Sequence, residues 1–190
     1  YSQEVMYRLV YVSTVDHYKY QWNVVRAVHL LRSKYNWPLQ LDLAGSATPS
    51  ALKLLRKSMN DCDPNGNWVN YHGLLDSHSL IQLLSSSDLG IFASSCENMP
   101  NILLQTMASG LPVACSSYGP MPEVLGPTGV YFNPLDISDI AHCLYRLIDS
   151  STYRAELASL SFKSAQQYSW HTCAYKTFSF LQLVSLNHSI

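Results

Sequence analysis

Residues 89–116 decide the fold, and they read LGIFASSCENMPNILLQTMASGLPVACS. The stretch opens with an apolar run of strand length, LGIFAS, and closes with a second one, PVACS. Between the two runs lie a polar loop and a segment whose apolar residues recur with helical spacing. A strand, a helix and a strand in this order predict a βαβ unit with two parallel strands.

The same alternation extends along the whole chain. Strands are predicted at 8–13, 39–45, 68–73, 89–94, 112–116 and 129–133. Helices are predicted at 20–35, 49–59 after a Thr48 cap, 76–87 with Asp76 as cap, from 100–101 onward, and at 136–150, 152–168 and 170–186. We therefore expect an α/β, Rossmann-like three-layer domain whose parallel sheet binds ligands at the carboxyl ends of its strands.

Length and composition fit a single domain spanning residues 1–190. Hydrophobic residues make up 47% and charged residues 13% of the 190 residues, which supports a sizeable core. The formal net charge of -1 and the lack of a long basic run argue against nucleic-acid partners. The chain begins at Tyr1 and enters a strand pattern almost at once, which we interpret as a piece of a longer protein.

Cysteine usage indicates neither a disulfide framework nor a zinc site. The five cysteines are widely scattered and form no CxxC pair. No His, Cys or Asp set has metal-ligand spacing, so we expect no metal and no cofactor. No apolar run approaches the roughly 18 residues of a membrane helix, and a reduced, cytoplasmic setting is expected.

The loop before the helix of the opening stretch is the first candidate site. The backbone amides of Asn101, Ile102 and Leu103 would be free at the positive end of the helix dipole, which suits a phosphate. Glu97 could accept hydrogen bonds from sugar hydroxyls, and Gln105 lies one turn beyond Asn101, where it could reach a ribose. Spacing alone equally allows Glu97 to complement the dipole and Gln105 to be a surface amide.

Three other loops follow predicted strands. Lys19 could hold a diphosphate, with His17 a weaker candidate, although Lys19 could equally be solvated. Gly45 allows close backbone approach to a ligand. The dinucleotide-binding pattern GxGxxG is absent, which argues against a dehydrogenase. Tyr71 and His72 could frame a nucleobase or simply pack on the sheet. Glu123, in a turn framed by Pro and Gly, is interpreted as structural.

Taken in order, the motifs resemble the C-terminal half of the family 4 (group 1) glycosyltransferases. These are retaining, nucleotide-sugar-dependent enzymes of the GT-B fold. The resemblance covers nearly the whole chain, from YVSTVDHYK through LDLAG and VNYHGLL to the terminal YSWHTCAYKTFSFL. Its most specific segment is ENMPNILLQTMASGLPV, which matches the family's E-x7-E motif.

The resemblance implies roles for individual residues. Glu97 would contact donor sugar hydroxyls, and Lys19 the diphosphate. Gln105 occupies the position of the second acid of the motif, which binds the ribose in the family. Thr14 occupies the position of an Arg that binds the diphosphate. This chain therefore lacks two charges that the family uses to bind the donor. The remaining donor contacts implied are the base slot and the backbone around the helix start, which comprise Gly45, Tyr71, His72, Gly73, Asn98, Met99, Asn101, Ile102 and Leu103.

The implied function is binding of the nucleotide-diphosphate sugar in a retaining hexosyltransferase of polysaccharide or glycolipid assembly. A glycan or lipid-linked acceptor would bind to a further, N-terminal domain, toward which the helix at about 170–190 would cross. The complete enzyme is expected in the cytoplasm, with peripheral association at the inner face of the membrane. The alternative is a degenerate, non-catalytic nucleotide-sugar-binding or interaction module. A nucleotide-sugar epimerase fits the motif poorly.

Overall fold

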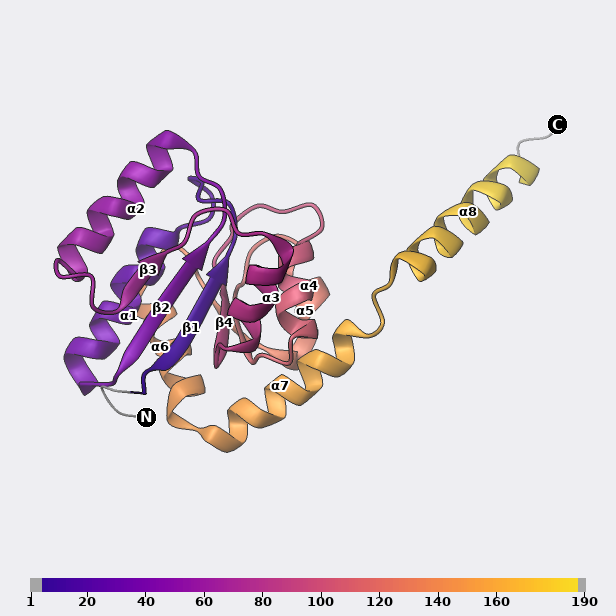
Figure 1. Ribbon diagram of the computed structural model, residues 1–190. Helices are drawn as coiled ribbons and strands as arrows, with labels where there is room; N and C mark the ends of the chain where they lie inside the picture. Colours follow the sequence, from indigo (N-terminus) through magenta and orange to yellow (C-terminus); the bar gives the residue numbers. More distant parts are fainter. Residues whose placement is uncertain (1–4, 188–190) are drawn as a thin grey trace.

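The computed structural model describes residues 5–187, which build a parallel sheet with helices on both faces (Figure 1). The strands are β1 (Tyr7–Val12), β2 (Leu39–Ala44), β3 (Val69–Tyr71), β4 (Leu89–Phe92), β5 (Val113–Ser116) and β6 (Val130–Phe132). They pair in the order β3-β2-β1-β4-β5-β6, and every pair is parallel. The sequence-based prediction of a parallel α/β sheet is confirmed.

The helices connect successive strands up to β6, and the last three follow that strand. They are α1 (Gln21–Tyr35), α2 (Pro49–Cys62), α3 (Ser77–Ser85), α4 (Asn101–Ala108), α5 (Met121–Leu125), a 3-10 turn (Gly126–Thr128), α6 (Ile137–Asp149), α7 (Ser151–Ala165) and α8 (Trp170–Asn187). Helix α1 packs against α2 and α6, while α4 packs against α7. The short helix α5 contains Glu123 in its first turn, in the position predicted for it.

Two helix starts have a cap residue predicted from the sequence, and one of the two residues makes a capping bond. The side chain of Asp76 accepts a hydrogen bond from the Ser79 amide at 2.8 Å, which confirms it as the cap of α3. Thr48 occupies the cap position of α2 but makes no capping bond, and its hydroxyl lies 3.5 Å from the Val15 carbonyl oxygen instead. The predicted helix start after Thr48 is confirmed, but the hydroxyl does not cap the helix, because the loop after β1 competes for it.

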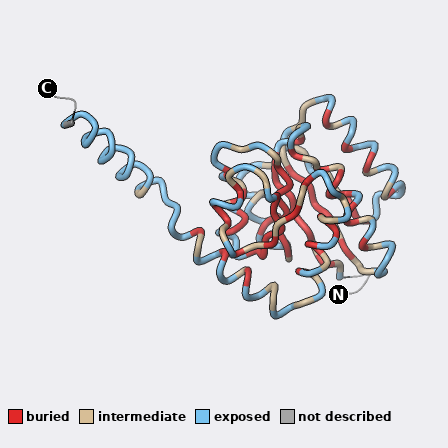
Figure 2. Tube along the Cα trace, turned by 180° about the vertical axis from the view of Figure 1, so that it is seen from behind, coloured by how far each residue is buried: buried red, intermediate tan, exposed pale blue. Residues whose placement is uncertain are grey.

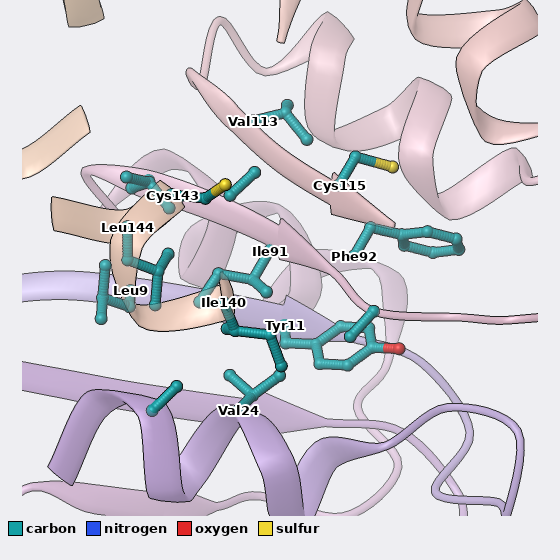
Figure 3. Packing of buried hydrophobic residues seen from close by; sticks show 14 of the residues in the cluster. Leu9, Tyr11, Val24, Ile91, Phe92, Val113, Cys115, Ile140, Cys143 and Leu144 are labelled. Carbon is teal, nitrogen blue, oxygen red and sulfur yellow. The ribbon is translucent and has the colours of Figure 1, made fainter. Parts of the chain in front are cut away.

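The central strand β1 is buried on both sides, as its apolar run requires. Leu9 and Tyr11 belong to the larger core cluster, whereas Val10 and Val12 belong to a smaller one with Leu83 and Leu84 of α3. Figure 3 shows Leu9 and Tyr11 packed among side chains from β4, α1 and α6. Burial therefore concentrates along the sheet, as the red segments of Figure 2 show.

Glycine at position 90 lets α4 approach the sheet closely. A Cβ atom at Gly90 would overlap the Cγ2 atom of Thr106 on α4. Because the loop that carries Glu97 joins β4 to α4, this contact sets how closely the two elements at its ends approach.

Helix α8 extends away from the rest of the domain (Figures 1 and 2). Its apolar side chains are exposed on every side, including Trp170 at 83% and Phe178 at 70%. None of the helices among residues 5–187 is long and apolar enough to cross a membrane. The predicted helix continues to about residue 190, but 188–190 lie outside the described residues.

The loop after β2 depends on Gly45, which has a φ angle of +143°. A Cβ atom there would overlap the carbonyl oxygen of Ser13 in the loop after β1. The close approach made possible by this glycine is thus between two loops of the domain itself, at the carboxyl edge of the sheet.

We expect Gly45→Ala to lower the free energy of unfolding by about 3 kcal/mol, because the new methyl group must displace backbone rather than a flexible side chain. The matched control is Gly66→Ala, at a φ of +65° with nothing within 4 Å of the added Cβ. That control should lose only about 1 kcal/mol, from the left-handed backbone alone. Urea denaturation measures both losses, and equal losses would contradict the close-contact argument.

Candidate functional site

Four loops meet at the carboxyl edge of the sheet because all the strands are parallel. The loop after β1 is bonded to the loop after β2 through Val15 N and the Ser46 oxygen at 2.7 Å. It is also bonded to the loop after β4, through Ser95 N and the Tyr18 oxygen at 2.8 Å. Gly45 N donates to the Gly73 oxygen at 2.8 Å, which ties in the loop after β3. The candidate residues therefore lie on one connected rim.

Lys19 and Glu97 form an ion pair across this rim, although they lie 78 positions apart in the chain. Their side chains are only 7% and 15% exposed. The Lys19 Nζ atom also lies 4.9 Å from the ring centre of Tyr18 and 5.4 Å from that of Phe92. The structure thus brings together the two residues that the resemblance assigns to the diphosphate and to the donor sugar.

Two hydrogen bonds hold the backbone of Lys19 in place. The Tyr11 hydroxyl donates to the Lys19 carbonyl oxygen at 2.9 Å, and the Lys19 amide donates to the Asp16 oxygen at 3.0 Å. Burial raises the pKa of Tyr11 well above its ordinary value, so its hydroxyl remains a hydrogen-bond donor. Tyr20, the next residue, adopts a left-handed conformation with φ of 50°. The backbone from which the Lys19 side chain extends is consequently held in place by β1 and by its own loop.

Thr14 lies on the same rim but its hydroxyl is directed to the loop after β2. Its Oγ1 atom is 3.2 Å from the Ser46 Oγ atom, and its carbonyl oxygen accepts a bond from Gln21 at 2.9 Å. His17, the weaker candidate, bonds to Ser50 at 2.9 Å. Neither residue forms a hydrogen bond with Lys19 or Glu97 in the described part of the chain.

The residues proposed for a base slot are also brought together. The Tyr71 hydroxyl donates to the Gly45 oxygen at 2.8 Å, and the His72 amide donates to the Leu43 oxygen at 2.9 Å. Gly73 has a φ of +68°, which is the left-handed region that glycine enters without strain. These bonds hold the loop after β3 close to the loop after β2.

Asp42 was missed by the sequence analysis, yet its side chain organises this end of the sheet. It is fully buried, and its carboxylate accepts four hydrogen bonds from side chains of three strands or strand ends. The donors are Gln40 at 2.8 Å, His72 at 2.8 Å, Asn70 at 3.1 Å and Arg8 at 3.3 Å. We call these five residues the Asp42 cluster. The available signal was an acid within the alternating strand LQLDLAG.

The start of α4 differs in two details from the prediction. Pro100 is the residue before the helix rather than its first residue. The Asn101 amide donates to the Met99 oxygen at 2.9 Å, so it is not free for a phosphate, because the tight turn at Met99 and Pro100 engages it. The side chains of Ile102 and Leu103 pack into the core, which leaves their backbone amides as the groups that could face a ligand.

The outer surface of α4 opens into a cavity of about 670 Å³. Asn101 and Gln105 line it from the helix and Met99 lines it from the loop, while the facing wall comes from the α7–α8 link and the first turns of α8. Asn98, one residue from Glu97, lies in the exposed part of the loop between this cavity and the ion pair. Among residues 5–187, no group of three or more His, Cys, Asp or Glu side chains could hold a metal ion.

The Asp42 cluster makes stability sensitive to acid. Burial alone would raise the pKa of Asp42, but bonds from His72, Gln40 and Asn70, with the charge of Arg8, hold it below its ordinary value. The stabilisation is therefore complete above the unfolded pKa of about 3.9 and is lost as pH falls through the lower folded value.

We expect Asp42→Asn to cost about 2 kcal/mol or more at pH 7, because the Arg8 charge loses its partner and buried donors lose an acceptor. Below pH 4 the stability of the variant should also fall less steeply than that of the wild type. Asp61→Asn, at an exposed acid on α2, is the control and should follow wild type. Urea midpoints measured from pH 2.5 to 7 test this expectation. If the midpoints of Asp42→Asn and wild type changed with pH in parallel, Asp42 would not be the source of the acid sensitivity.

Comparison with known proteins gives a consistent result. A family model described as "Glycosyl transferases group 1" matches residues 7–150. The O-antigen chain mannosyltransferase B of Escherichia coli is 30% identical over 118 residues, which are 62% of this chain and 31% of that protein. A mannosyltransferase of Mycolicibacterium hassiacum, named MMP alpha-(1->4)-mannosyltransferase, is 31% identical over 107 residues, 54% of this chain and 26% of that protein. The matched segment therefore spans about a third of these relatives or less.

Solved structures share the fold. Anabaena HepE, determined in complex with UDP and glucose, superposes with a TM-score of 0.82 at 19% identity, over 93% of this chain and 48% of that one. The C-terminal domain of LpcC from Francisella tularensis, a glycosyl transferase group 1 family protein, gives 0.75 at 21% identity. That alignment covers 87% of this chain and 88% of the LpcC domain.

Proposed function

The chain belongs to the group 1 glycosyl transferases, and from this premise we propose that it is the donor-binding domain of a retaining hexosyltransferase. Its substrate would be a nucleotide-diphosphate hexose, and the acceptor a glycan or a lipid-linked glycan. The observation that carries the proposal is the shielded ion pair of Lys19 and Glu97 at the carboxyl edge of the sheet.

The ion pair offers the two kinds of group that a donor sugar nucleotide needs. A nucleotide sugar offers a negative diphosphate to Lys19 and hydroxyl groups to Glu97 at the same time. Each partner then exchanges a single ionic contact for a charge-assisted hydrogen bond to the ligand. Because both side chains are mostly buried, these new bonds form away from bulk water, where they are stronger.

Catalysis in this proposal is electrostatic. As the bond between the anomeric carbon and the diphosphate breaks, negative charge grows on the leaving phosphate. Lys19 and the amides of Ile102 and Leu103 at the start of α4 would stabilise that charge. Attack by the acceptor hydroxyl on the leaving-group face would retain the anomeric configuration. Lys19 and the helix dipole supply the positive charge, so the proposal invokes no metal.

The acceptor side of the proposal involves α8. A helix that exposes apolar side chains all round is stable in water only when another surface covers it. Trp170, Tyr175, Phe178 and Phe180 are each at least 64% exposed. An N-terminal domain that holds the acceptor is the proposed cover. Such an enzyme would act in the cytoplasm, peripherally at the inner face of the membrane.

We expect Lys19→Ala to weaken binding of UDP, GDP or ADP by about 10- to 100-fold, the effect of one lost charge-assisted bond. Titration calorimetry on the 190-residue chain measures this. Lys57→Ala removes an exposed lysine of α2 and should leave affinity unchanged. Tight nucleotide binding that is unchanged in Lys19→Ala would refute the assignment of Lys19 to the diphosphate.

Glu97→Gln should act on the sugar rather than on the nucleotide. The amide keeps the shape but loses the charge, so the preference for nucleotide sugar over nucleotide alone should fall by about 10-fold. Calorimetry with UDP and UDP-glucose, or with GDP and GDP-mannose, separates the two affinities. An unchanged ratio in the variant would remove Glu97 from sugar recognition.

A non-catalytic binding module is the second candidate, favoured by the neutral Gln105 and by the Thr14 hydroxyl that is directed to Ser46. Gln105→Glu together with Thr14→Arg, introduced in the complete protein, should raise turnover if the enzyme is merely attenuated. Release of free nucleotide diphosphate from the donor is the measurement. Tight donor binding with no turnover in either form would favour the module.

A further inference from the structure

Tyr11, near the end of β1, is connected to both ends of Lys19. Its hydroxyl donates to the Lys19 carbonyl oxygen at 2.9 Å. Its ring packs edge to face on Phe92 of β4, with the ring centres 6.0 Å apart, and the Lys19 Nζ atom lies 5.4 Å from the centre of the Phe92 ring. We propose that Tyr11 is a positioning residue that sets where the Lys19 ammonium group lies relative to Glu97, and hence to the donor diphosphate. The part that concerns the diphosphate rests on the proposed function.

The Tyr11 hydroxyl does more than fill the core. Tyr11 is only 1% exposed and belongs to the larger core cluster. A buried hydroxyl gives up its hydrogen bonds to water, so a phenylalanine would fill nearly the same space without that loss. Burial raises the pKa of Tyr11, and the charge of Glu97 raises it further, so the hydroxyl keeps its proton. Its donor is therefore available to the loop that carries Lys19.

The contact with Phe92 extends this influence to the charged end of Lys19. A lysine side chain has a flexible four-carbon stem, so a fixed backbone alone does not place its ammonium group. The electron-rich face of an aromatic ring attracts a cation within about 6 Å of the ring centre. Phe92 is 3% exposed, and Figure 3 shows its ring and that of Tyr11 both extending away from Leu9 and Leu144. Tyr11 thus fixes the start of the Lys19 side chain and packs against a ring beside its end.

A purely structural role for Tyr11 would have a different signature. If Tyr11 only supported the fold, its loss would weaken all parts of the site together, or none of them. A residue that acts through Lys19 should affect only ligands that carry phosphate. The ratio of the affinities for a nucleotide diphosphate and for its nucleoside measures that difference, because the two ligands share the base and the ribose.

The first test uses Tyr11→Phe and the nucleotide among UDP, GDP and ADP that binds best, with its nucleoside. NMR titration gives both affinities. We expect the variant to bind the nucleotide about 5-fold more weakly and the nucleoside equally well. In a Lys19→Ala background, Tyr11→Phe should cause no further loss, because the group that it positions is gone. The matched control is Tyr131→Phe, which removes a hydroxyl that donates to the Gly126 carbonyl oxygen in the turn before β6.

The second test needs no ligand. N-hydroxysuccinimide acetate modifies accessible lysines, and mass spectrometry gives the rate at each site, with the exposed Lys57 as the reference in the same sample. Lys19, which is 7% exposed and paired with Glu97, should react more slowly than Lys57. Tyr11→Phe should raise the Lys19 rate about 5-fold. Phe92→Leu keeps an apolar side chain but removes the ring, and should raise the rate as well.

Three results would overturn the inference: a nucleotide-to-nucleoside ratio that falls in Lys19→Ala but not in Tyr11→Phe, an equal loss of nucleotide and nucleoside affinity in Tyr11→Phe, or a Lys19 acetylation rate unchanged in both ring variants. Each of these leaves the donor proposal standing. A wild-type chain that binds no nucleotide would refute the donor proposal instead. A raised acetylation rate in Tyr11→Phe would then still support the positioning of Lys19, and an unchanged rate would refute both.

Discussion

The ion pair between Lys19 and Glu97 is the contact on which the arrangement of the site depends. Two charges with little access to water are tolerated only when they face each other and their surroundings are well ordered. The order comes from β1 and β4, which lie side by side in the sheet and end in the two loops that carry these residues. The loops are thereby organised before any ligand arrives, which lowers the ordering cost of binding.

Backbone proximity supports this arrangement from two sides. Gly45 lets the loop after β2 touch the loop after β1, and Gly90 lets α4 lie against β4. A side chain at Gly45 would displace the loop after β1, which carries Lys19, and one at Gly90 would push α4 away from β4, whose connecting loop carries Glu97. Both glycines are needed for contacts within the protein itself, and they affect a ligand only through the position of the loops.

The sequence predicted much of this architecture because hydrophobic periodicity and helix-start chemistry are local signals. Asp76 as a cap and the six strands follow from residues within a few positions of each other. Lys19 and Glu97 could be placed on one edge because parallel strands all end there. The competition for Thr48 and the bonds to Asp42 from Arg8, Asn70 and His72 could not be predicted, since they depend on partners that only folding brings near. The engaged amide of Asn101 is different, because its partner Met99 is two residues away and the tight turn that joins them has no distinct sequence pattern.

The Asp42 cluster also determines which sequence changes this part of the domain can tolerate. Four donors share two carboxylate oxygens, so removing Gln40 or Asn70 leaves each oxygen with another partner. Replacing Asp42 instead deprives all four donors of their acceptor. Substitutions should therefore accumulate readily at the donors and hardly at all at the acid. A single carboxylate thus gives β1, β2 and the end of β3 a shared mutational constraint.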